Sequence, residues 1–159
     1  MKTVQRRAFT AGGAALLMSC AAPGDTPVQA TGIANAPVLP REFRGAWVAT
    51  VANIDWPRPV AIDAATQQAQ IRAIVQRASQ LGLNALLLQV RPACDAIYPS
   101  ALEPWSEYLS GAQGRDPGYD PLTLWIDEAH RAGLQLHAWF NPFRAKHPSA
   151  KSPLAANHI

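Results

Sequence analysis

The sequence is poor in cysteine and in charge. Only 2 of its 159 residues are cysteines, 16% are charged, and the net charge is +3. So small a basic excess gives no indication of a nucleic-acid partner. If Cys20 is removed or modified, as argued below, Cys94 has no partner and no disulfide forms within the chain. No set of residues has the spacing of a metal site, and we expect neither a metal nor another cofactor.

A long hydrophobic run is also missing. The apolar run near the amino terminus, residues 11–18, is far shorter than the roughly 20 residues that cross a bilayer. Because Lys2, Arg6 and Arg7 precede this run, we interpret the segment as an export signal rather than a membrane span. The pair Arg6-Arg7 followed by Phe9 resembles a twin-arginine signal.

Residues 17–20, LMSC, resemble a bacterial lipobox, whose cysteine is lipidated after cleavage. The alternative is ordinary cleavage after Ala30, with Cys20 lost. We favour lipidation, with residues 1–20 a twin-arginine lipoprotein signal and residues 21–40, rich in Ala, Pro, Thr and Gly, a flexible tether. The protein would then lie in the periplasm or cell envelope and touch the membrane only through its lipid.

The remaining residues, 41–159, have the composition of one folded domain. Residues 43–51 are rich in aromatic and β-branched residues and predict a strand. Asp63 can cap a helix over residues 64–81, whose apolar residues recur at helical spacing, and Gly82 ends it.

A second set of elements repeats this pattern. Residues 84–90 are apolar at nearly every position, which is typical of a parallel strand covered on both faces. Asp120 and Pro121 begin a helix over residues 121–132, with Trp125 on its apolar face, and residues 135–141 predict a third strand. Successive βα units of this kind begin either a (β/α)₈ barrel or an open doubly wound sheet.

The end of the sequence contains no fourth strand. Residues 145–159 are polar and contain two prolines, and a complete barrel needs roughly 250 residues. We therefore interpret the chain as the amino-terminal part of a larger α/β protein.

Three blocks in this region resemble the glycosyl hydrolase-like family 10 of bacterial envelope proteins. They are REFRGAWVATVANIDWP, then GLNALLLQVRPACDAIYPSALEPWSEYLSGAQGRDPGYDPL, then EAHRAGLQLHAWFNPFRA, and the resemblance as a whole covers residues 42 to about 148. The resemblance implies a (β/α)₈ barrel, of which this chain carries about three βα units, and hydrolysis of glycosidic bonds. It also implies a polysaccharide substrate such as the glycan strands of peptidoglycan, and partners in the envelope or the division machinery.

The long segment 91–121 has no helical or strand period and joins the second strand to the following helix. Ligands bind at this end of parallel strands, so we interpret it as an active-site loop. It is too aromatic for a disordered linker. Residues expected to contact a sugar lie in this loop or just after a strand: Asp55, Trp56, Arg91, Asp95, Tyr98, Trp105, Asn141 and Arg144.

Three carboxylates lie near strand ends, and glycoside hydrolysis needs two such groups across the bond. Asp95 is the strongest candidate, although it could equally bind a sugar hydroxyl or pair with Arg91. We expect Glu103 to be solvated and Asp55 to form either a turn or a sugar contact. The main acid and base are expected beyond Ile159, so no catalytic residue is assigned.

Other prominent side chains have structural alternatives. Among the tryptophans that could stack on a sugar ring, Trp56, Trp105 and Trp139, we favour Trp105 because it lies inside the loop. We expect His137 to be a core histidine and Cys94 a packed thiol.

Three functions remain open at this level. They are a glycan hydrolase, a saccharide-binding barrel that lost its acid and base, and an envelope lipoprotein that scaffolds partners. Inward carboxylates at the ends of strands four to seven would distinguish the first from the second.

Overall fold

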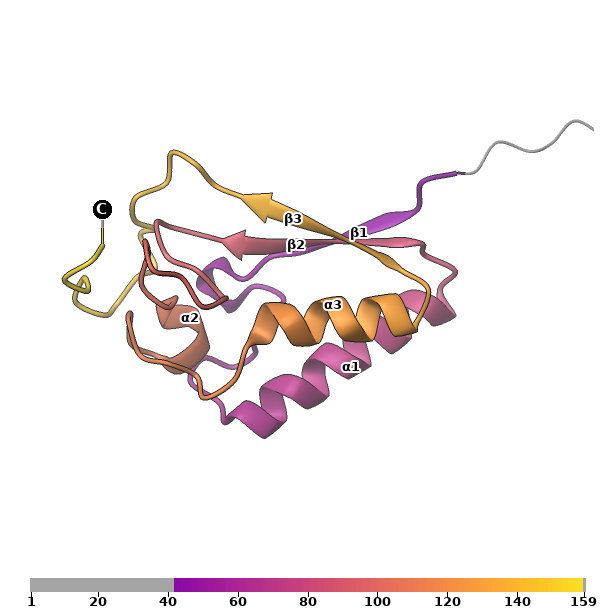
Figure 1. Ribbon diagram of the computed structural model, residues 1–159, viewed down its shortest axis with the longest axis horizontal. Helices are drawn as coiled ribbons and strands as arrows, with labels where there is room; N and C mark the ends of the chain where they lie inside the picture. The colour runs from indigo at the N-terminus through magenta and orange to yellow at the C-terminus, as the bar shows by residue number, and fades with distance from the viewer. Residues whose placement is uncertain (1–41, 159) are drawn as a thin grey trace, which may run out of the picture. The chain divides into compact units, whose positions relative to one another are not determined.

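The computed structural model describes residues 42–158, and the predicted signal, tether and Cys20 lie outside them. Its strands β1 (Gly45–Val48), β2 (Ala85–Arg91) and β3 (Gln135–Phe140) form a parallel sheet in the order β1-β2-β3. Helix α1 (Ala64–Gln80) connects β1 to β2, and α3 (Pro121–Arg131) connects β2 to β3 (Figure 1). The predicted succession of βα units is therefore confirmed.

Local signals set the ends of both helices. The Asp63 carboxylate accepts a hydrogen bond from the Thr66 amide at 2.9 Å, and Asp120 accepts one from Thr123 at 3.1 Å. These bonds satisfy amide groups that have no partner inside the helix. Gly82, at φ 71°, follows α1 in the left-handed conformation that glycine adopts without steric cost.

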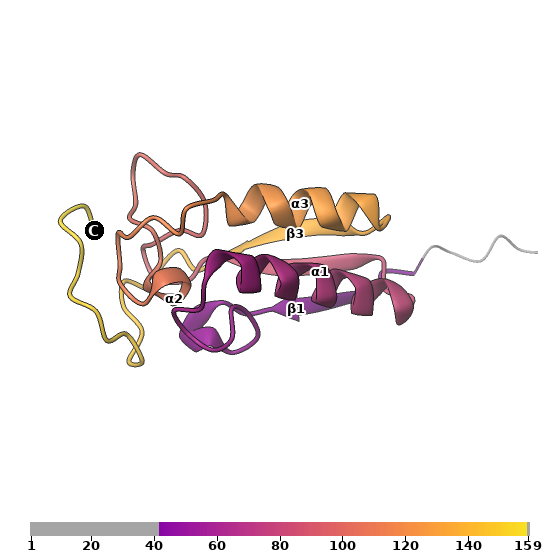
Figure 2. The same ribbon diagram turned by 90° about the horizontal axis from the view of Figure 1, so that it is seen from below.

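The two helices lie side by side on one face of the sheet (Figures 1 and 2). Arg72 of α1 and Glu128 of α3 form an ion pair of 3.1 Å between them. The core lies between helices and sheet and includes large side chains that are fully buried: Trp56, Ile71, Leu86, Leu88 and Trp125. A barrel and an open sheet can both begin with this arrangement. No helix within residues 42–158 combines the length and apolarity needed to cross a membrane.

The opposite face of the sheet carries an uncovered aromatic layer. The rings of Trp47 on β1 and Trp139 on β3 meet edge to face across β2, with centroids 5.0 Å apart. Phe43 packs in the same way against His137 at 5.5 Å. Trp47 is 61% exposed. His137 lies on the same face and is exposed, so it is not part of the core that residues 42–158 form between helices and sheet.

Two parts differ from the predicted elements. Strand β1 ends at Val48 rather than at residue 51, because the chain turns there into a short 3₁₀ helix, η1 (Val51–Asn53). The loop 91–121 contains a helix of its own, α2 (Glu107–Ser110), and buries Leu109 in the core. Tertiary contacts thus order a segment that has no periodic pattern.

Candidate active site

A buried polar side chain on the central strand links the carboxyl ends of all three strands. Gln89 of β2 is fully buried, and its amide oxygen accepts hydrogen bonds from the backbone N–H groups of Thr50 (3.0 Å) and Val51 (2.9 Å) beyond β1. Its amide nitrogen donates to the Asn141 side-chain oxygen just after β3. Thr50 Oγ1 donates to the Gln89 carbonyl at 2.9 Å. Buried amides need such partners, and here the partners fix where the strands end.

Arg91, the last residue of β2, forms a largely buried ion pair with Glu103. Its Nε donates to both carboxylate oxygens of Glu103, at 2.7 and 2.9 Å, and the two side chains are only 15% and 10% exposed. Its Nη1 donates to the Asn141 carbonyl at 2.7 Å, and its Nη2 to the Cys94 sulfur at 3.3 Å. The expectation that Glu103 is solvated is therefore wrong, and Arg91 pairs with Glu103 instead of Asp95. The Cys94 thiol is buried, as predicted.

Several other predicted site residues lie in the same loop or in the segment that follows β3. Arg144 Nη1 donates to the Pro92 carbonyl at 3.4 Å, which ties the segment after β3 to the residue that follows Arg91. Tyr98 and Trp105 are half-buried and pack against the core with part of each ring exposed. Burial, and then the nearby Glu103 carboxylate, raises the pKa of Tyr98 above its usual value, so this phenol stays neutral at pH 7. Neutral aromatic surfaces of this kind can stack on sugar rings.

Asp95, in the loop after β2, is buried and stabilises that loop. It is 2% exposed and accepts a hydrogen bond from the Ala93 amide at 2.9 Å. The space that it borders with Glu107 is about 10 Å³, which is too small for a sugar. The pKa of Asp95 is raised to about 6, mainly by burial and to a smaller degree by the Glu107 carboxylate, while hydrogen bonds from Ser106 and Ala93 act in the opposite direction. The closed space leaves no room for the predicted sugar contact and indicates a structural carboxyl.

The raised pKa predicts how Asp95→Asn changes stability in the full-length protein. Because the pKa is higher in the folded state than the 3.8 of an unperturbed carboxyl, protonation stabilises the fold. This contribution is fully present below pH 3.8 and is lost as the pH rises through about 6, at a cost on the order of 3 kcal/mol. We therefore expect the effect of Asp95→Asn on the melting temperature, relative to the wild type, to be more favourable at pH 7.5 than at pH 4. At pH 7.5 the wild type carries a buried charge that the variant lacks. An equal difference at both pH values would contradict this assignment.

The residues after β1 have structural roles. Asp55 Oδ2 accepts a hydrogen bond from the Ala49 amide at 2.8 Å, which agrees with the turn interpretation. Trp56 is fully buried, stands edge to face against Trp125 at 5.6 Å, and donates to the Gln67 carbonyl at 3.2 Å. A ring without exposed surface cannot stack on a sugar, so that expectation for Trp56 is wrong.

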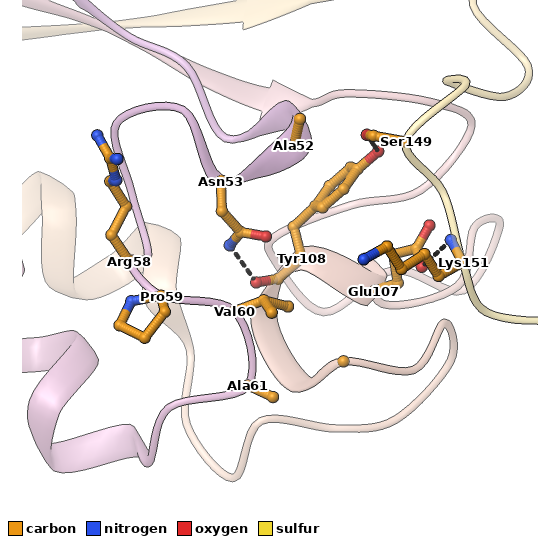
Figure 3. A pocket seen from close by; sticks show the side chains of 11 residues that line it. Ala52, Asn53, Arg58, Pro59, Val60, Ala61, Glu107, Tyr108, Ser149 and Lys151 are labelled. Carbon is orange, nitrogen blue, oxygen red and sulfur yellow. Dashed lines mark hydrogen bonds between the residues drawn. The ribbon is translucent and has the colours of Figure 1, made fainter.

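A separate cavity of about 570 Å³ lies between the loop after β1, helix α2 and residues 149–151 (Figure 3). Its size fits a small ligand, but most of its polar groups are already bonded to one another. Asn53 donates to the carbonyls of Pro57 (2.7 Å) and Tyr108 (2.8 Å), and the Tyr108 hydroxyl bonds Ser149 at 3.2 Å. Neither Arg91 nor Asn141 lines this cavity. We therefore place the candidate site at the strand ends.

Sequence reasoning missed Gln89, although a signal was present. Gln89 is the one polar residue in the otherwise apolar run of residues 85–90. An amide in a buried strand requires hydrogen-bond partners, so its presence indicates a specific set of contacts. It also missed Glu107, whose Oε2 accepts the amides of Lys151 (3.0 Å) and Ser152 (2.9 Å). No local pattern predicts that pairing. Across residues 42–158, no group of three or more His, Cys, Asp or Glu residues could hold a metal ion.

The model of the family described as "Glycosyl hydrolase-like 10" matches residues 42–158. "Glycosyl hydrolase YngK" of Bacillus subtilis (strain 168) is 48% identical over 104 residues, which cover 65% of this chain and 20% of that protein. "Glycosyl hydrolase DigH" of Escherichia coli (strain K12) is 37% identical over 155 residues, 89% of this chain and 35% of that protein. The chain therefore spans about a third or less of these relatives.

Proposed function

Because the chain belongs to the glycosyl hydrolase-like 10 family, we propose that the full-length protein is a glycoside hydrolase on a (β/α)₈ barrel. The three parallel strands with helices on one face supply the first part of such a barrel. Its acid and base come from later strands, and the residues described here bind and orient the glycan. Asn141, Arg144, Tyr98 and Trp105 are the contacts that we propose.

One observation carries this proposal. Polar side chains from separate parts of the chain converge at the carboxyl ends of β2 and β3, where (β/α)₈ enzymes place their active sites. Arg91 and Gln89 use their donor groups for hydrogen bonds within the protein. Gln89 donates to the side-chain oxygen of Asn141, and Arg91 donates to its backbone oxygen. A pre-arranged amide after β3, together with the half-buried rings of Tyr98 and Trp105 in the loop after β2, suits a saccharide, which offers hydroxyl groups and apolar ring faces.

The proposed substrate is a cell-envelope glycan such as the glycan strands of peptidoglycan. An exported, lipid-anchored enzyme would meet this substrate in the cell envelope. The family resemblance also suggests this substrate. Envelope or cell-division proteins would be its partners.

Purified glycan strands test the activity. Full-length protein should release soluble fragments from them, and Asn141→Ala or Trp105→Ala should lower kcat/KM about tenfold or more. Gln76→Ala, on the exposed surface of α1, serves as the control and should leave turnover unchanged. The two site variants should lose no more than about 1 to 3 kcal/mol of stability, because Asn141→Ala leaves the Gln89 NH₂ group without its partner and Trp105 is only half-buried. A loss of several kcal/mol in either variant would mean that the residue is structural.

Binding without turnover would favour the alternative, a saccharide-binding barrel without an acid and base. The same polar cluster could serve that role. Absence of both binding and turnover would leave the scaffolding lipoprotein as the better description.

The lipid anchor makes a further prediction. Cells that express the full-length protein and are fed a palmitate analogue should label the wild type, because residues 17–20 resemble a lipobox. Cys20→Ala should lose the label, while Cys94→Ala should keep it, since the Cys94 thiol is buried in the fold. Equal labelling of Cys20→Ala would exclude this anchor.

A further inference from the structure

The orientation of the Gln89 side chain is determined by its surroundings. Its amide oxygen meets two backbone N–H groups, those of Thr50 and Val51, at 3.0 and 2.9 Å. Only the oxygen of an amide can accept these two bonds, and the NH₂ group in its place would face two donors. The Gln89 nitrogen therefore has to point the other way, toward Asn141.

The same reasoning then applies to Asn141. Because the Gln89 nitrogen is a donor, the Asn141 atom that meets it must be the oxygen. The Asn141 NH₂ group is left without a hydrogen-bond partner among residues 42–158, and the residue is partly exposed. Arg91 holds the adjacent backbone through the Asn141 carbonyl at 2.7 Å.

We propose that Gln89 is a positioning residue that fixes the orientation of the Asn141 side-chain amide. The amide oxygen then faces Gln89, and the NH₂ group is presented to the glycan as a donor. The group recognised is then an acceptor oxygen, such as a hydroxyl or a carbonyl oxygen of the sugar. This inference rests on the proposed glycan-binding function. It assigns Gln89 an effect on recognition although the side chain itself is fully buried.

Gln89→Glu tests the inference because it keeps the shape of the side chain and reverses the direction of its hydrogen bond with Asn141. An ionised glutamate still accepts the Thr50 and Val51 amides, which favour the charged form, but it has no proton to give to Asn141. The Asn141 amide must then turn by 180° to donate to it, and it presents an oxygen to the glycan. We expect the Kd of the full-length protein for purified glycan strands to rise about tenfold or more at pH 8.

A double-mutant cycle separates this role from general damage. In an Asn141→Ala background, Gln89→Glu should change the Kd by less than about twofold, because the group through which it acts is gone. An undiminished effect in that background would overturn the inference.

Gln67→Glu is the matched control. Gln67 is another buried glutamine, 2% exposed, whose Nε2 donates to the carbonyls of Ile62 and Leu109, both at 2.9 Å. The same substitution there should lower the melting temperature and leave the Kd unchanged. Equal weakening by Gln67→Glu and Gln89→Glu would show that instability alone explains the effect.

The orientation itself can be measured without a ligand. In protein labelled with ¹⁵N at asparagine, the Asn141 NH₂ signals are identified by their loss in Asn141→Ala. Gln89→Glu should slow their exchange with solvent, since the group then bonds a buried carboxylate. Unchanged exchange in Gln89→Glu would refute the proposed control of the Asn141 orientation by Gln89. Slowed exchange in Gln89→Glu, together with a wild type that binds no glycan, would refute only the proposed function.

Discussion

Residues 41–159 produced alone should not form a stable monomer that cleaves glycans. Within residues 42–158 the sheet has two unpaired edges, on β1 and β3, and such edges invite association. Its face opposite the helices exposes large aromatic side chains, with Phe43 59% and Trp47 61% exposed. In the proposed barrel this face would be covered by the remaining strands.

We expect partial structure with dimers or aggregates, because α1 and α3 still cover one face of the sheet. Size-exclusion chromatography and a glycan-release assay measure the two halves of this prediction. Trp47→Lys offers a direct check, since it removes apolar surface from the open face and should reduce association. A cooperative, monomeric and active fragment would show that the chain is not part of a barrel.

Removing one partner of the Arg91–Glu103 ion pair should be among the most destabilising single changes in the full-length protein. Arg91→Met leaves Glu103 only 10% exposed and without its cation. An uncompensated buried charge typically costs about 3 to 5 kcal/mol. Urea-induced unfolding measures the loss, and the double variant Arg91→Met/Glu103→Leu should recover part of it, because both charges are then gone.

The chain offers a matched control for this prediction. Arg131 pairs with Glu128 at 2.6 Å on the surface, with the arginine 67% exposed. Arg131→Met should therefore cost only about 0 to 1 kcal/mol. If Arg91→Met is as mild as Arg131→Met, the loop is held to the strand by other contacts and the ion pair adds little.

The sequence by itself determined the order and type of the main elements. Asp63 and Asp120 begin helices, and Gly82 ends one, because caps act on backbone groups a few residues away. The apolar run of β2 indicated a covered parallel strand, because burial on both faces selects apolar residues at every position. These signals are local or periodic, so they can be read without knowing the fold.

Only the tertiary structure decided which candidate residues can reach a ligand. Gln89 and Asn141 are 52 residues apart and form one unit, while Glu103 turns inward to Arg91. Trp56 and Asp95 look like site residues by position, yet both are buried. Their burial depends on how the loops after β1 and β2 fold over the sheet ends. Such contacts join distant parts of the chain, and no local pattern encodes them.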